Sequence, residues 1–147
     1  MRTAFLLGRL LFGGFFLYNG INHFKDAKTH TDYAAQKGVP APDLAVSATG
    51  VALLVGGGSI LTGIKPKLGT QAILGFLLSV SPLMHDFWND ESPDQRMHNM
   101  VDFSKNLALA GAALALMAVE EPWPVSVPAA QPTRIERVKR AARRVAA

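Results

Sequence analysis

Four long apolar stretches that carry almost no charge constrain this chain more than any other feature. A helix needs about 20 mostly apolar residues, each rising 1.5 Å, to cross the hydrocarbon core of a bilayer. The fourth stretch reaches that length only if Asp102 and Lys105 belong to it. The four stretches cover about residues 3–24, 44–64, 68–87 and 99–119. We therefore expect an all-α integral membrane four-helix bundle, formed by residues 1–121.

A soluble helical bundle is the main alternative to this interpretation. Each of its helices should show a polar face at the helical period, but residues 51–55 and 107–119 are apolar all round. A soluble protein of 147 residues has too little interior to bury four such helices. Small residues also recur four positions apart, as Ala52 with Gly56 and Gly111 with Ala115, which lets membrane helices approach closely. The membrane bundle is favoured.

The first apolar stretch follows Arg2 and could be a secretory signal peptide. No small-residue cleavage site follows it promptly, and residues 19–24 read Asn-Gly-Ile-Asn-His-Phe. We expect this stretch to be retained as the first helix.

The distribution of charge predicts the orientation of the bundle. The turn at residues 65–67 and the tail after Pro132 are basic, whereas the loop at residues 86–96 is mainly acidic. The positive-inside rule then places both termini in the cytoplasm, with the bundle in a bacterial cytoplasmic membrane.

The net charge of +4 lies mostly in the tail, so we expect a lipid bilayer and no nucleic acid as its partner. The chain has no cysteine, which excludes disulfide and thiol redox chemistry by this polypeptide.

The region after the last apolar stretch divides into two parts. Residues 122–132 contain four prolines and are expected to form a stiff linker. Residues 133–147 begin with a capping box, Thr133 with Glu136, and then place apolar residues on one face among arginines and lysines. They are expected to form a short basic amphipathic helix on the inner leaflet, although a disordered basic tail is the alternative.

Polar residues at membrane depth are costly, so their positions are the main functional clue. They gather at the predicted outer ends of the helices and form a candidate ligand site: Asn19, His23, His85, Asp86, Trp88, Asp102, Lys105 and Asn106. Lys105 is expected to pair with Asp102 or Asp86. The simpler interpretation is that these residues anchor helix ends at the interface and bond only to each other.

Arg9 and the histidines are two further polar features of the chain. Arg9 is an isolated intramembrane charge in the inner half, where it either snorkels to the cytoplasm or meets Ser59 or Gln71. Imidazoles at positions 23, 85 and 98 could ligate a metal, but the chain has no recognisable ligand spacing, so no metal is expected.

Several segments together resemble the DoxX family over about residues 4–119. The most specific is the run from Gly8 to Phe24, GRLLFGGFFLYNGINHF, and the others are Gly56-Gly57, His85-Asp86-Phe87-Trp88 and Lys105-Asn106-Leu107. The resemblance implies a four-helix membrane bundle. Many relatives carry an acidic residue before the glycine pair, whereas this chain has Leu53 and Leu54, which argues against a proton-relay role for the second helix.

Some DoxX-like proteins are membrane subunits of quinone-linked oxidoreductases, and others belong to complexes that respond to thiol-oxidative stress. The resemblance therefore implies at most a subunit of a redox complex, with a quinone as the one cofactor it suggests and a redox protein as partner. The alternative is a non-catalytic membrane anchor or a carrier of small lipophiles. An oligomer is compatible with either function.

Overall fold

The computed structural model describes residues 2–127, and this part of the chain is all-helical, without a strand. Its four long helices are α1 (Arg2–Lys25), α3 (Pro42–Thr62), α4 (Pro66–Met84) and α5 (Pro93–Met117). Two short elements lie between them, the helix α2 (Ala27–Gln36) and the 3-10 turn η1 (Phe87–Asn89). The expected amphipathic helix at residues 133–147 lies outside the described residues.

Local sequence explains where most of these helices begin and end. Proline stands in the first turn of α3, α4 and α5, where its fixed φ suits a helix and its missing N–H is not needed. Gly63 ends α3 with a positive φ of 73°, a conformation that glycine adopts without steric cost. The last helix was expected at 99–119 but starts at Pro93, because Ser92-Pro93-Asp94 forms a helix start well before the apolar stretch.

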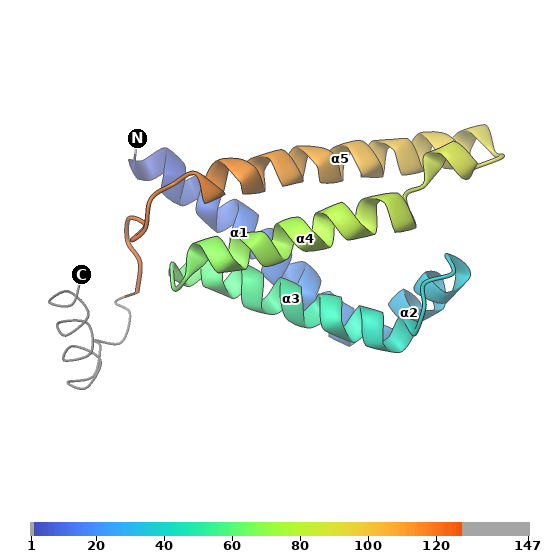
Figure 1. Ribbon diagram of the computed structural model, residues 1–147, viewed down its shortest axis with the longest axis horizontal. Coiled ribbons are helices and arrows are strands. Elements are labelled where there is room, and N and C mark those ends of the chain that lie inside the picture. The colour runs from blue at the N-terminus through green and yellow to red at the C-terminus, as the bar shows by residue number, and fades with distance from the viewer. Residues whose placement is uncertain (1, 128–147) are drawn as a thin grey trace, which may run out of the picture.

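The four long helices form a membrane bundle in which α1 packs on α3, α3 on α4, and α4 on α5 (Figure 1). Glycines permit the closest approaches. A Cβ at Gly57 would lie 2.6 Å from the backbone nitrogen of Leu17, and one at Gly56 would lie 3.0 Å from the carbonyl oxygen of Gly69. One buried cluster joins the helices: Phe12, Phe16, Leu53, Ile60, Ile73, Leu77, Ala110, Ala113 and Trp123.

The outer surface of the bundle is strongly apolar. All four long helices are long and apolar enough to cross a membrane. Large apolar side chains face outward on every one of them, including Leu7, Leu11, Val51, Val55, Leu68, Leu78, Leu107 and Leu114. A surface of this kind is stable against lipid and not against water. The chain is a multi-pass membrane protein.

The segment after α5 returns to the bundle. Trp123 is buried and packs edge to face on Phe5, and the backbone N–H of Val127 donates to the carbonyl of Thr62 at 2.8 Å. The sequence assigned residues 122–132 to a linker, whereas residues 122–127 belong to the packed bundle. The proline pattern did not reveal this because the contacts of the segment are made with residues far away in sequence, such as Phe5, Arg9 and Thr62. The start of α1, the α3–α4 turn and residues 118–127 thus share one end of the molecule (Figure 1).

Candidate functional site

A cavity of about 600 Å³ lies at the opposite end of the bundle. It is lined by the start of α3 and the end of α4, two helices that diverge from the turn joining them (Figure 1). The ends of α1, α3 and α4 line it, together with α2 and one turn of α5. Most of its wall is apolar. Two lining hydroxyls, of Thr49 and Ser79, donate to carbonyls of their own helices. The other polar side chains fall into two groups. These are called here the first polar group (Asn19, His23, His30) and the second polar group (Tyr33, His85, Lys105, Asn106).

The first polar group joins α1 to α2. The rings of His23 and His30 stack with their centroids 4.6 Å apart and an angle of 17° between their planes. Nδ1 of His23 lies 2.9 Å from the carbonyl oxygen of Asn19, one helical turn earlier. That contact fixes the ring on α1 if Nδ1 carries the proton, and it leaves Nε2 for another partner.

The second polar group joins α2 to α4 and α5. The hydroxyl of Tyr33 donates to the carbonyl of Met84 at 3.2 Å, beside His85. Asn106 is only 8% exposed, and Lys105 is half exposed and lies 2.6 Å from Oδ1 of Asp102. Nδ1 of His85 is buried and has no hydrogen-bond partner within residues 2–127. A buried ring nitrogen of this kind is costly unless a ligand, water or proton acceptor satisfies it.

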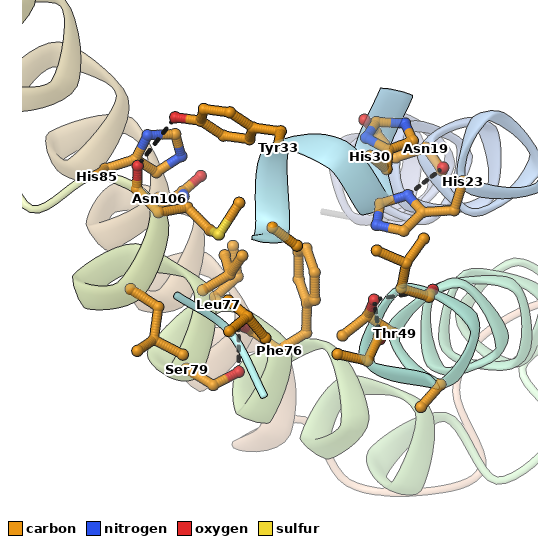
Figure 2. A pocket seen from close by; sticks show the side chains of 18 of the residues that line it. Asn19, His23, His30, Tyr33, Thr49, Phe76, Leu77, Ser79, His85 and Asn106 are labelled. Atoms are coloured by element: carbon orange, nitrogen blue, oxygen red, sulfur yellow. Dashed lines mark hydrogen bonds between the residues drawn. The ribbon is translucent and has the colours of Figure 1, made fainter. Parts of the chain in front are cut away.

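An aromatic ring separates the two groups. Figure 2 shows Phe76 between Asn19, His23 and His30 on one side and Tyr33, His85 and Asn106 on the other. The centroid of Phe76 lies 6.2 Å from that of His23, in an edge-to-face arrangement. The cavity therefore offers hydrogen-bonding groups at two ends and an apolar middle.

The cavity wall includes five of the eight side chains that the sequence proposed as ligand contacts: Asn19, His23, His85, Lys105 and Asn106. The other three lie outside it. Asp86 pairs with Lys37, Asp102 pairs with Lys105, and Trp88 packs on Phe87 and Phe103. Trp88 contributes instead to a small separate groove with Leu78 and Phe103.

The sequence did not predict His30 and Tyr33 as cavity residues, because the four apolar stretches leave the segment between residues 24 and 44 without an expected helix. A signal was present, since residues 27–36 contain neither glycine nor proline and place His30, Tyr33 and Ala34 on one face. A ten-residue helix is only marginally stable alone, however, and α2 exists because it packs on α3.

A salt bridge holds α2 over the cavity. Nζ of Lys37, just after α2, lies 2.6 Å from Oδ1 of Asp86, and both side chains are partly buried. The hydrogen bond to Asp86 raises the pKa of Lys37 above its ordinary value, and partial burial opposes this effect without cancelling it. Lys37 therefore stays charged and keeps this contact throughout the neutral range.

Arg9 lies at the other end of the bundle and takes no part in the cavity. It is 4% exposed and donates to the carbonyls of Leu61, Pro124 and Val125 at 2.8, 2.7 and 3.0 Å. The expected partners Ser59 and Gln71 are not used, because the guanidinium instead caps free carbonyls at the end of α3 and in the returning segment. Arg9 is a buried charged residue with a structural role.

The three histidines weighed as metal ligands do not meet. His23 and His85 lie in different polar groups, and His98 is on the surface of α5. In the described part of the chain no cluster of three or more histidine or acidic side chains is arranged to hold a metal ion.

Comparison with known proteins identifies one family. The family model described as DoxX matches residues 4–86, which is more than half of the chain. No curated protein and no solved structure matches it.

Proposed function

Because this chain belongs to the DoxX family, we propose that it is the membrane subunit of a redox complex and binds a quinone or quinol in the cavity. The two polar groups on either side of Phe76 carry this proposal. A quinone has two oxygens at opposite edges of a flat ring. Imidazole and amide groups at both ends of a mostly apolar cavity suit such a ring.

Access from the bilayer supports a lipophilic ligand. Phe15 and Leu83 line the cavity, yet they are 46% and 53% exposed on the apolar outer surface. The cavity wall is therefore continuous with the face that we assign to lipid. A ligand dissolved in the bilayer could reach the polar groups without crossing water.

The proposed orientation places the cavity in the outer leaflet of a bacterial cytoplasmic membrane. The end that holds Arg9 also carries the basic α3–α4 turn, Lys65-Pro66-Lys67, whereas acidic side chains surround the start of α5. The positive-inside rule assigns the basic end to the cytoplasm.

Binding of a short-chain benzoquinone to the protein in nanodiscs, measured by calorimetry, tests the site. Loss of one hydrogen bond of about 1 kcal/mol should weaken binding about fivefold in His23→Ala and in His85→Ala. Trp88→Phe, which lies outside the cavity, should bind like the wild type. If the wild type does not bind, or if both histidine variants bind as well as it does, the assignment of the site is wrong.

A carrier or anchor without a redox role is the second candidate, and the apolar middle of the cavity favours it. Val46, Leu77, Val80 and Leu83 would accept many lipophiles. Purification in a mild detergent separates the two functions. A bound quinone together with a redox enzyme supports the first function, and other lipids without a redox enzyme support the second.

A further inference from the structure

Asp102 has two carboxylate oxygens with different partners. Oδ1 is 2.6 Å from Nζ of Lys105. Oδ2 faces two imidazoles, with Nδ1 of His85 at 3.9 Å and Nε2 of His98 at 3.4 Å. The ion pair with Lys105 occupies Oδ1 and leaves Oδ2 free between the two rings.

The two histidines belong to different environments. His85 lines the cavity and its side chain is 20% exposed, whereas the side chain of His98 is 78% exposed on the second turn of α5. His98 also lies before the apolar part of α5, close in sequence to the exposed charged residues Asp94 and Arg96. Asp102 therefore stands between a group that faces the ligand cavity and a group that faces water.

We propose that His85, Asp102 and His98 form a proton path between the cavity and the aqueous face of the protein. This deepens the proposed function, because a quinol must release protons when it is oxidised. The unpartnered Nδ1 of His85 supplies the key observation. Within residues 2–127, Oδ2 of Asp102 is the acidic oxygen that the structure places beside it.

Each step moves one proton and no electron. A proton from the ligand is taken up by Nε2 of His85 while Nδ1 of the same ring releases its proton to Oδ2 of Asp102. Oδ2 passes a proton to Nε2 of His98, and His98 releases one to water. The first transfer needs Asp102 to approach His85 by about 1 Å, since a hydrogen bond forms near 3 Å. This step leaves His85 as its Nε2–H tautomer, and the ring returns to the Nδ1–H tautomer when Nε2 loses its proton and Nδ1 gains one by exchange with water.

Charged groups on α5 and after α2 face the ring of His85. Lys105 on α5 and Lys37 after α2 both bring positive charge toward the ring, while Asp102 brings negative charge. Asp86 is held by Lys37, and the hydroxyl of Tyr33 is engaged with Met84. Asp102 is thus the one of these groups that is placed to accept the proton.

Exchange of the His85 ring proton with water tests the path without any ligand. The chain has four histidines, so 15N-histidine resonances in nanodiscs can be assigned from single variants. We expect His98→Gln and Asp102→Asn each to slow exchange at His85 by at least about tenfold. Exchange at His23 should not change, and Asp94→Asn, an acidic variant on the same helix, should behave like the wild type.

The two variants together distinguish loss of the proton path from loss of the fold. Asp102→Asn leaves Lys105 without its partner and could disturb the fold, but His98 is exposed and its replacement leaves packing intact. Unchanged exchange at His85 in His98→Gln overturns the path, whatever Asp102→Asn shows. Quinone binding is measured separately, so a protein that fails to bind quinone but shows the expected exchange loses the proposed function and keeps the path.

Discussion

Lys37 and Asp86 join the end of α2 to the end of α4 through a contact of 2.6 Å between Nζ and Oδ1. This contact and the hydrogen bond from Tyr33 to Met84 hold α2 against the far end of the bundle. Since α2 contributes His30 and Tyr33 to the cavity, the salt bridge helps to keep the two polar groups facing each other.

Replacing Lys37 tests this relationship. Lys37→Met should lower the free energy of unfolding in detergent by about 1 kcal/mol at pH 8, since a partly buried pair is lost. The pKa of Lys37 is raised in the folded protein, so its contribution is complete below the ordinary lysine pKa and is lost as pH rises through the raised value.

Wild type and Lys37→Met should therefore differ in thermal melting at pH 8 and converge only as pH rises through the raised pKa of Lys37, above the ordinary lysine value. Lys28→Met is the matched control, because Lys28 forms an exposed pair with Asp32 on the same helix and should change little. A difference that grows with pH would contradict this account.

Gly57 and Gly58 are adjacent in α3 but differ in what surrounds them. A Cβ on Gly57 would lie 2.6 Å from the nitrogen of Leu17 and 2.8 Å from the carbonyl oxygen of Gly13, while one on Gly58 would meet nothing within 4 Å. Gly57→Ala should destabilise the bundle by about 1–3 kcal/mol, because the backbone of α1 must move.

Gly58→Ala should be neutral or stabilise α3 by up to about 1 kcal/mol, since alanine restricts the unfolded chain. Unfolding in mixed micelles measures both variants. Equal stability of the two would show that α1 and α3 do not pack as described.

Arg9 should be essential for the returning segment. In Arg9→Met three carbonyls lose a charged donor, and a hydrogen bond to a charged group contributes about 1.5–3 kcal/mol. We expect a clear loss of thermal stability and faster protease cleavage at residues 118–127.

Lysine should rescue Arg9 only in part, because an ammonium cannot reproduce the planar guanidinium that reaches three acceptors. Arg2→Met, at an exposed residue of the same helix, is the control. If Arg9→Met melts like the wild type, the arginine is solvated and not buried.

The proposed orientation can be tested with cysteine reporters, since the chain has no cysteine of its own. Asp32→Cys and Asp94→Cys should react with a membrane-impermeant maleimide in intact cells, and Glu120→Cys should react only after the membrane is opened. All three positions are exposed. Labelling of Glu120→Cys in intact cells would reverse the assignment of the two sides.

The sequence by itself determined the family, the all-helical class and the four long apolar helices. These follow from runs of neighbouring residues, since transfer into lipid depends on the composition of about 20 consecutive positions. The first-helix motif, GRLLFGGFFLYNGINHF, identified the family because it too is a run of neighbouring residues. The sequence also placed polar residues near the ends of the helices, because the position of a residue along a spanning helix fixes its depth in the membrane.

Only the tertiary structure decided which of those residues meet. Asp86 directly follows the cavity residue His85 in the chain. Its side chain nevertheless pairs with Lys37, 49 positions away, and not with Lys105. Arg9 finds acceptors 52 to 116 positions away. His30 and Tyr33 reach the cavity because α2 folds back over it. Such pairings depend on how the helices cross and on where loops return, and no local pattern encodes that geometry.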